Sequence, residues 1–231
     1  INDASIRIGL RLSKDETIVR MPFEVRHMGS KYPIFSFDFT GAKRGVLPAS
    51  YDYLRLEGRM QYRLNLPPVG YSRLMLEGGK IFGKVPYLLL KLHEGNGTYF
   101  YDRYAFSCMN FYEFSSDAWI SFFYEHHFNG FLLGRVPLLK KLNWREVFVF
   151  KGVYGTLSAR NDGSLPNTKA VMLFPVGMSS VEHPYLETGF GIENIFRLLR
   201  VDCIWRLTHH RAVPGLSIPT FTVNFSLNLK F

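Results

Sequence analysis

Residues 220–231 alternate strictly between polar and apolar side chains. Successive side chains of a β-strand point to opposite faces, so this pattern predicts a strand with one apolar and one polar face. The segment is long enough to cross a membrane, which takes about 9 to 11 residues in a β-barrel. Such a strand either covers a soluble core or faces lipid around a polar lumen. Its apolar face consists of Phe221, Val223, Phe225, Leu227, Leu229 and Phe231.

The same period of two recurs along the chain and predicts an all-β fold. The expected strands are 5–12, 17–28, 34–40, 53–66, 71–82, 104–114, 118–128, 146–157, 184–193, 200–208 and 220–231. They number about eleven, whereas bacterial single-chain barrels have an even number of strands. We therefore expect either that N-terminal strands are missing or that one of these segments is not a strand.

No run of residues approaches the roughly 18 apolar positions of a membrane-spanning helix, so a membrane crossing would have to use a closed sheet. An aromatic content of 16% favours such a sheet, because barrels carry aromatic girdles at both interfaces. The expected fold is an antiparallel, up-and-down transmembrane β-barrel that forms one domain over residues 1–231. We expect the chain to be the C-terminal part of a larger barrel, with N-terminal strands and a periplasmic domain ahead of it.

The net charge of +9 does not indicate a nucleic-acid protein, because the basic residues are spread singly instead of forming a stripe. Cys108 and Cys203 lie far apart and have no metal-ligand spacing. A disulfide framework, a zinc site and a cofactor are therefore not expected.

Charged residues on the polar faces of the expected strands would point into the lumen. The candidates are Arg55, Glu57, Arg59, Arg63 and Arg206. The arginines of the polar faces would either line a path for anions or form salt bridges with carboxylates of the same face on neighbouring strands. These arginines are Arg7, Arg11, Arg20, Arg55, Arg59, Arg63 and Arg73, and the carboxylates are Glu24, Glu57, Glu77, Glu187, Glu193 and Asp202.

A weak internal repeat links residues 83–91 with 134–141 and, more loosely, with 194–200. Two expected strands separate each copy from the next, so all three should lie at the same, periplasmic end of the barrel. Basic and proline residues in short aliphatic segments fit the membrane interface, although ordinary turns are the alternative. The residues concerned are Lys84, Pro86, Lys91, Arg135, Pro137, Lys140, Lys141, Arg197 and Arg200.

The opposite rim would carry the connections 67–70, 115–117, 158–183 and 209–217. The polar, turn-rich stretch from Asn161 to Pro166 suits an exposed loop and is the favoured place for binding from outside the cell.

Glu125, His126 and His127 form the one cluster that suggests enzymatic chemistry. Glu125 and His127 share a strand face with Ser121 and could act as a base and its orienting group in a lipid or peptide hydrolase. The sequence contains neither a Gly-x-Ser-x-Gly nor a His-Glu-x-x-His motif. The favoured interpretation is that the histidines form hydrogen bonds within the wall near a strand end. The glycines of 95–97 and 189–191 are expected in turns and close packing.

Residues 80–96, 124–131, 135–140 and 144–146 together resemble the C-terminal part of an uncharacterised outer-membrane family of Bacteroidetes. Longer members of that family place a carboxypeptidase-regulatory-like domain ahead of a barrel. The resemblance extends from about Leu54 to Phe231 and implies a barrel in the bacterial outer membrane, in contact with its lipids.

A more distant similarity connects residues 185–194, 198–202 and the C-terminal segment with the last three strands of the BamA, TamA and two-partner-secretion barrels. The terminal Phe231 resembles the assembly signal that the barrel-insertion machinery reads. These resemblances imply a transport, assembly or scaffold role, with protein partners in an outer-membrane complex. A barrel-borne hydrolase that uses His127 and Glu125 and a simple diffusion pore are the alternatives.

Overall fold

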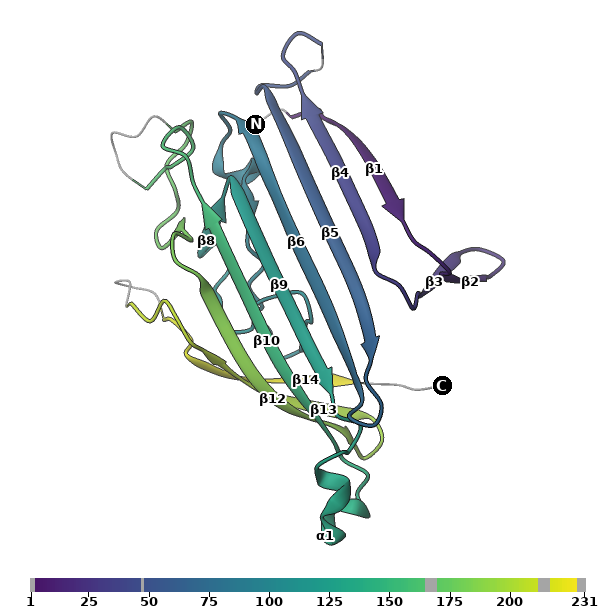
Figure 1. Ribbon diagram of the computed structural model, residues 1–231. Coiled ribbons are helices and arrows are strands. Elements are labelled where there is room, and N and C mark those ends of the chain that lie inside the picture. Colours follow the sequence, from purple (N-terminus) through teal and green to yellow (C-terminus); the bar gives the residue numbers. More distant parts are fainter. Residues whose placement is uncertain (1–2, 47, 165–169, 212–216, 228–231) are drawn as a thin grey trace.

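The protein forms one large antiparallel sheet of nine strands in the order β1-β4-β5-β6-β9-β10-β12-β13-β14. The computed structural model describes residues 3–46, 48–164, 170–211 and 217–227 (Figure 1). The strands of the sheet are β1 (Ile6–Leu12), β4 (Ile34–Ala42), β5 (Tyr53–Asn65), β6 (Tyr71–Gly83), β9 (Ala118–His127), β10 (Arg145–Thr156), β12 (Tyr185–Ile195), β13 (Leu199–Arg206) and β14 (Phe221–Leu227).

The other elements are short. Strands β2 (Thr17–Arg20) and β3 (Val25–Gly29) form a hairpin, and β7 (Lys91–Leu92), β8 (Phe114–Ser116) and β11 (Ser179–Ser180) form a small second sheet. The helices are η1 (Tyr87–Leu89), η2 (Leu133–Arg135) and α1 (Pro137–Lys140). Among the described residues, none of the helices is long and apolar enough to cross a membrane.

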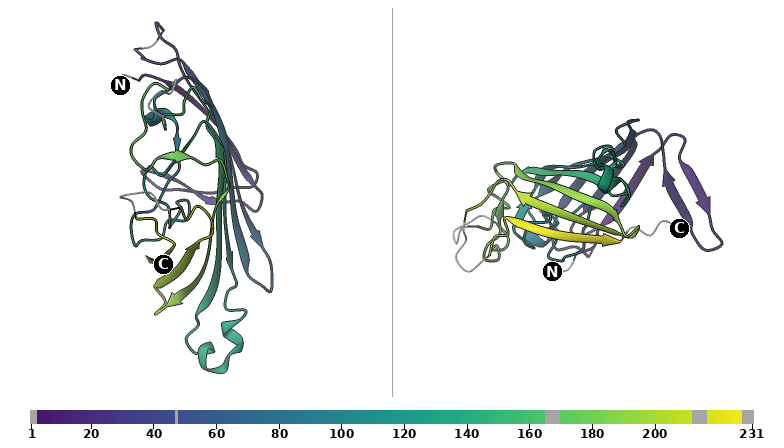
Figure 2. Two further views of the ribbon diagram at one scale, coloured as in Figure 1. Left: turned by 90° about the vertical axis from the view of Figure 1, so that its left-hand side faces the viewer. Right: turned by 90° about the horizontal axis from the view of Figure 1, so that it is seen from below.

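The predictions of an all-β fold and of a large antiparallel sheet are confirmed. Within the described part of the chain the sheet does not close into a barrel, because β1 and β14 each have a single neighbour in it. The sheet is nevertheless strongly curved, and β12 to β14 curl back around its concave side (Figure 2).

Two of the expected strands are not strands of this sheet. Residues 17–28 turn back at Met21, whose N–H donates to the Glu24 carbonyl at 2.8 Å, and so form the β2–β3 hairpin. Residues 104–114 belong to a connection between β6 and β9, residues 84–117, which we call the insert. The insert folds against the concave face of the sheet (Figure 2). Residues 105–109 are enclosed there on both sides, with Phe106 only 1% exposed.

The two faces of the sheet have opposite chemistry. The convex face is apolar, and many of its large side chains are exposed: Ile6, Ile8, Leu10, Leu12, Phe35, Phe37, Phe39, Leu54, Leu64, Phe82, Ile120, Tyr154, Phe190, Trp205, Phe221, Phe225 and Leu227. The concave face carries charged and polar groups that are buried: Glu77, Glu125, His127, Lys151, Glu187, Glu193, Arg200, Asp202, Arg206 and Asn224. The concave face also carries buried apolar side chains, so what distinguishes this sheet from that of a soluble domain is the extent of the exposed apolar convex face.

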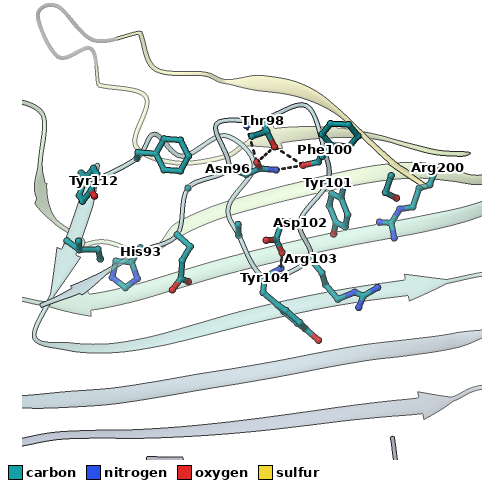
Figure 3. Close-up of a pocket in the computed structure, with 16 residues that line it drawn as sticks. His93, Asn96, Thr98, Phe100, Tyr101, Asp102, Arg103, Tyr104, Tyr112 and Arg200 are labelled. Carbon is teal, nitrogen blue, oxygen red and sulfur yellow. Dashed lines mark hydrogen bonds between the residues drawn. The ribbon is translucent and has the colours of Figure 1, made fainter. Parts of the chain in front are cut away.

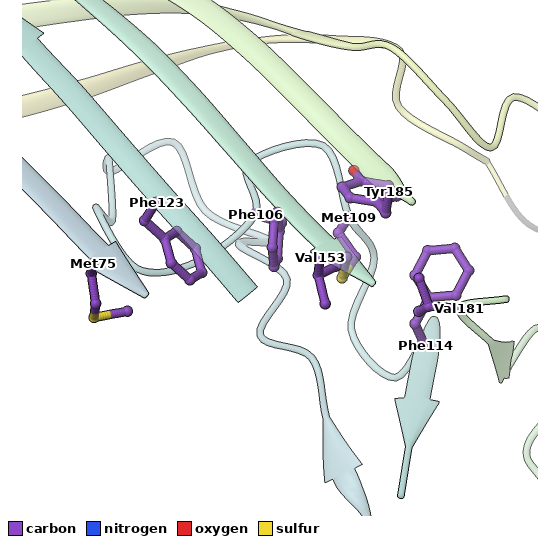
Figure 4. Packing of buried hydrophobic residues seen from close by; sticks show 8 residues of the cluster. All are labelled: Met75, Phe106, Met109, Phe114, Phe123, Val153, Val181 and Tyr185. Carbon is purple, nitrogen blue, oxygen red and sulfur yellow. The ribbon is translucent and has the colours of Figure 1, made fainter. Parts of the chain in front are cut away.

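The apolar core lies between the concave face and the insert. One cluster joins insert residues to the sheet and to the long connection after β10, and it consists of Met75, Phe106, Met109, Phe114, Phe123, Val153, Val181 and Tyr185 (Figure 4). A second cluster, near the start of the insert, contains Ala42, Tyr53, Ile81, Val85, Leu90 and Trp119. The insert is therefore packed as part of the fold.

The expectation that the three repeat copies share one rim is wrong. Of the described strands of the large sheet, β9 alone lies between residues 83–91 and 134–141, so these two copies are at opposite ends of the sheet. Copies 134–141 and 194–200 do lie at the same end, together with the 67–70 turn that was expected on the other rim. The sequence pattern predicts a strand at residues 104–114, and without that strand the first copy moves to the other end of the sheet.

Candidate functional site

The insert is held on the concave face by charged side chains that point inward from the sheet. Glu187 of β12 accepts hydrogen bonds from the backbone N–H groups of Ser107, at 2.8 Å, and Cys108, at 2.7 Å. The hydroxyl of Tyr185 donates to the same carboxylate at 2.7 Å. Because Glu187 is completely buried, its charge is stabilised by these donors and not by water.

Two cations from neighbouring strands act in the same way. Lys151 of β10 donates through its Nζ to the carbonyls of Asp102, at 2.8 Å, and Ala105, at 2.6 Å. Arg206 of β13 binds the Cys108 carbonyl at 3.1 Å and forms an ion pair with Glu113 at 2.6 Å. Inward charges of three adjacent strands thus fix residues 102–113.

Glu125 of β9 is the centre of the most connected cluster of charges. Its Oε1 accepts from Tyr101 Oη at 2.6 Å and from Arg200 Nη2 at 3.1 Å, and its Oε2 accepts from Arg103 Nε at 2.6 Å. Arg200 is itself bound to Asp202 at 2.7 Å, and its guanidinium lies 4.4 Å from the centre of the Tyr101 ring. The carboxylate is therefore fully engaged by donors.

Outside the sheet strands, the insert carries groups whose pKa values are shifted. Burial, together with the bound Glu125 carboxylate, raises the pKa of Tyr101 well above its usual value, so this phenol stays protonated and donates. Burial and the nearby Lys91 ammonium lower the pKa of His93 to about 3. His93 is therefore a neutral imidazole at pH 7, with its Nε2 2.9 Å from Ser116 Oγ.

Both histidines of the 125–127 cluster form hydrogen bonds within the wall. His126 on the convex side contacts Ser72 Oγ at 2.8 Å and the Val69 carbonyl at 3.0 Å. His127 on the concave side contacts Glu193 Oε2 at 3.1 Å and stacks on Tyr71 with 4.5 Å between ring centroids. Ser121 lies four residues before Glu125 on the same strand, roughly 13 Å away, which is too far for a nucleophile of that pair.

The insert also reaches the outer edge of the terminal strand. Tyr101 N–H donates to the Phe225 carbonyl and Phe225 N–H donates to the Tyr99 carbonyl, each at 2.7 Å, as in a parallel bridge. Asn224 adds a side-chain hydrogen bond to the Thr98 carbonyl at 3.0 Å. Part of the β14 edge is therefore occupied by the insert.

Two cavities open beside the insert. The first, of about 900 Å³, is lined by insert residues His93, Asn96, Tyr101 and Arg103 and by Arg200 of the sheet. Figure 3 shows Tyr101 and Arg200 side by side at one end of it and His93 near the other. The second, of about 870 Å³, lies between the β2–β3 hairpin, β5, β6 and the insert.

The expected lumen-facing residues all lie on the concave side, and most of them are paired. Arg55 contacts Glu57 at 2.7 Å, Arg59 contacts Glu77 at 2.6 Å, and Arg206 contacts Glu113. Salt bridges between neighbouring strands thus account for Arg59, whereas Arg63 has no carboxylate partner among the described residues.

The expected interfacial residues separate into two groups. Lys84, Arg135, Pro137, Lys140, Lys141 and Arg197 are exposed. Pro86 is buried, and so are Lys91 and Arg200, which form ion pairs with Glu77 and Asp202. These last two cations therefore point into the protein and not toward lipid headgroups.

Of the expected assembly-signal residues, Phe221, Phe225 and Leu227 are exposed on the convex side and Val223 is half-buried. Leu229 and Phe231 lie outside the described residues.

The expected exposed loop at 161–164 is instead anchored at its start. Asn161 is 1% exposed, accepts from Val85 N–H at 3.1 Å and donates to Asp117 at 3.1 Å. This contact joins the 158–183 connection to the first repeat copy, which confirms that both lie at the same end of the sheet. Pro166 lies outside the described residues.

Sequence analysis missed Lys151 and assigned Glu187 only to salt bridges between strands, although both residues hold the insert. Their signal is a single charge on a strand face that is otherwise apolar or small, as in Val147, Val149, Lys151 and Val153. Such a charge needs a buried partner.

Comparison with known proteins gives one finding about the family. The model of the C-terminal domain of DUF5686, a family of unknown function, matches residues 2–159. The match includes the N-terminal residues that the sequence resemblance left aside, and it ends before β12. No protein with a curated description matches the chain.

Proposed function

The chain belongs to the uncharacterised DUF5686 family, and from the exposed apolar convex face of its sheet we propose that it forms part of a β-barrel wall in the bacterial outer membrane. In this proposal it acts as a transport or assembly and scaffold component, with its insert as an internal plug. Because the sequence also resembles an outer-membrane family of Bacteroidetes, we propose a source in that group.

The exposed apolar convex face is the observation that carries the proposal. Charged residues occur on this face of the described strands only near its two ends, at Lys80 and Glu146. Lys80 lies beside Ala118 and Glu146 beside Phe128, so about ten residues of strand, roughly 33 Å, separate them. At a strand tilt of about 40° this corresponds to about 25 Å, the height of the apolar band of outer-membrane barrels.

The buried concave face supports a plugged wall over a simple diffusion pore. Charged groups facing a water-filled channel would be solvated, whereas Glu187, Lys151 and Glu125 are at most 2% exposed and bind the insert. A permanently open channel would require breaking these contacts, and each buried charge would then lose its partner.

The edges of the sheet show that the proposed barrel wall requires further strands. Strand β1, and β14 where the insert leaves its edge free, would pair with further strands of the same protein or of a partner, because an open edge leaves backbone groups unsatisfied in lipid. The matched domain is described as C-terminal, which fits additional strands elsewhere in the protein. During biogenesis the terminal strand with Phe231 would be the segment that the insertion machinery recognises.

Cell fractionation tests the proposal. We expect the native protein in the outer-membrane fraction, resistant to carbonate washing, extracted by detergent and heat-modifiable in gel mobility. Replacement of Phe231 by Ala should reduce insertion, whereas Thr220→Ala, a change on the polar face of the same segment, should not. Recovery of the native protein as a monomer without detergent would overturn the proposal.

The same preparation separates the alternatives. Persistent conductance of the purified protein in a planar bilayer would favour a pore. Hydrolysis of lipid or peptide that is lost in His127→Ala would favour an enzyme.

A further inference from the structure

The second cavity contains two arginines that face each other and that form no ion pair with a carboxylate of the described residues. Arg63 of β5 and Arg73 of β6 are direct partners in the antiparallel register, and both side chains lie on the concave side. Neither forms a hydrogen bond or an ion pair with a carboxylate in the described part of the chain. Like charges directly opposite on neighbouring strands destabilise a sheet. The pair therefore resembles a site that is completed by an anion.

The carboxylate on the strand beside Arg73 does not supply that anion. Glu125 is the register partner of Arg73 on its other side. Both Glu125 oxygens, however, are already occupied by Tyr101, Arg200 and Arg103. The cavity wall as a whole holds four permanent cations, Lys31, Arg63, Arg73 and Arg103, against two carboxylates, Asp15 and Glu125.

An aromatic ring holds the two arginines in place. The guanidinium carbons of Arg63 and Arg73 lie 4.2 Å and 5.3 Å from the centre of the Tyr71 ring. That ring is itself fixed by stacking on His127. Guanidinium groups anchored on an aromatic face keep their N–H donors free, and their planar fork matches the oxygens of phosphate.

We propose that the cavity between the β2–β3 hairpin, β5, β6 and the insert binds an anion that carries a phosphate group, through Arg63 and Arg73 with Arg103 at its side. The phosphate group can belong to a free phosphorylated solute or to a lipid headgroup, because both present the same oxygens. The inference concerns only the concave face and does not rest on the membrane location proposed above.

Titration of the purified full chain with inorganic phosphate, and separately with detergent micelles containing phosphatidylglycerol, tests the site. We expect Arg63→Gln and Arg73→Gln each to weaken binding by about tenfold. Arg73→Lys, which keeps the charge but not the fork, should weaken binding less. The matched control is Arg59→Gln on the same strand face as Arg63, because Arg59 is already paired with Glu77. This control should bind like the wild type.

The melting temperature gives a second readout that a structural role would not produce. Without added anion, Arg63→Gln and Arg73→Gln should melt at a higher temperature than the wild type, because the like-charge pair is removed. At one fixed concentration, added phosphate or lipid should raise the melting temperature of the wild type and of Arg59→Gln more than that of Arg63→Gln or Arg73→Gln.

Binding of inorganic phosphate identifies a soluble ligand, and Arg73-dependent binding of the micelles alone identifies a headgroup. Both results support the site. Equal weakening in all the Gln variants, or no binding of either probe to the wild type, would overturn it.

Discussion

Arg200 of β13 donates to Glu125 of β9 at 3.1 Å, although two strands, β10 and β12, lie between them in the sheet. In a flat sheet the two backbones would be about 14 Å apart. The contact shows how strongly the sheet curls, and both side chains are only 2% exposed. A sheet that curls in this way encloses the charges of its concave face and leaves the apolar side chains of its convex face outside. The proposed membrane wall requires this geometry.

Replacing Glu187 by Gln should loosen the insert. The carboxylate accepts two backbone N–H groups and the Tyr185 hydroxyl, and an amide would turn one acceptor into a donor. We expect a loss of about 3 kcal/mol in the free energy of unfolding. Chemical denaturation measures the loss, and limited proteolysis should cut within residues 102–113.

Glu57→Gln is the control for that variant. Glu57 also faces inward, but its side chain is 20% exposed and its pair with Arg55 is partly solvated. The loss should be below about 1 kcal/mol, with no new cleavage site. Equal losses in the two variants would contradict the role given to Glu187.

Gly191→Ala should also be destabilising. A Cβ at this position would overlap the Asp202 carboxylate, with Asp202 Cγ only 2.9 Å away. Asp202 cannot move aside easily, because it is fully buried and bound to Arg200. We expect a loss of about 1 to 3 kcal/mol in a denaturation experiment. Gly134→Ala, where nothing lies within 4 Å of the added carbon, should be nearly neutral.

Stability should depend on pH through His93. The pKa of this buried imidazole is about 3 in the folded protein, against 6.5 for an ordinary histidine. The unfolded chain therefore binds the additional proton as the pH falls below 6.5. The contribution of neutral His93 to the free energy of unfolding is therefore fully present above pH 6.5. It decreases by about 1.4 kcal/mol per pH unit as the pH falls below 6.5.

Unfolding free energies measured between pH 7.5 and about pH 5 should show this slope in the wild type, and His93→Gln should show a smaller one. The upper part of this range avoids the titration of ordinary carboxyl groups. An unchanged slope in the variant would mean that another group is responsible.

Hydrogen exchange should reveal the insert at the edge of β14. The Phe225 amide donates to the Tyr99 carbonyl and the Tyr101 amide donates to the Phe225 carbonyl, so both amides should exchange slowly. The amide of Val223 points to the same edge, where the described structure gives it no acceptor, so in the purified chain without further paired strands it should exchange faster. Fast exchange at Phe225 would show that the insert does not cover the edge.

The faces of individual strands could be predicted from sequence, but the insert could not. Strand β5 follows a strict alternation, and its arginines lie on the concave side as expected. Residues 104–114 look like a strand because both of their sides are largely apolar, yet it is residues 105–109 that the sheet and the rest of the insert enclose, whereas Tyr104, Phe111 and Tyr112 are exposed. Local pattern cannot distinguish these two causes of burial.

The candidate site depended on contacts between residues far apart in the chain. Glu187 and Cys108 are 79 residues apart, and no local signal connects them. The misassigned segment also shifted the strand count by one, which placed Lys84 and Pro86 at the wrong end of the sheet. One wrongly predicted strand therefore also put the 67–70 turn and residues 83–91 at the wrong ends of the sheet.

Fluorescence of the native tryptophans tests the membrane wall most directly. Trp205 lies on the convex face of β13 and is 41% exposed, whereas Trp119 points inward from β9 and is 5% exposed. The chain contains three tryptophans, so replacing two of them by Phe leaves either reporter alone. Each variant would be reconstituted in vesicles with brominated acyl chains. The account predicts strong quenching of Trp205 and little quenching of Trp119, and an unquenched Trp205 would contradict it.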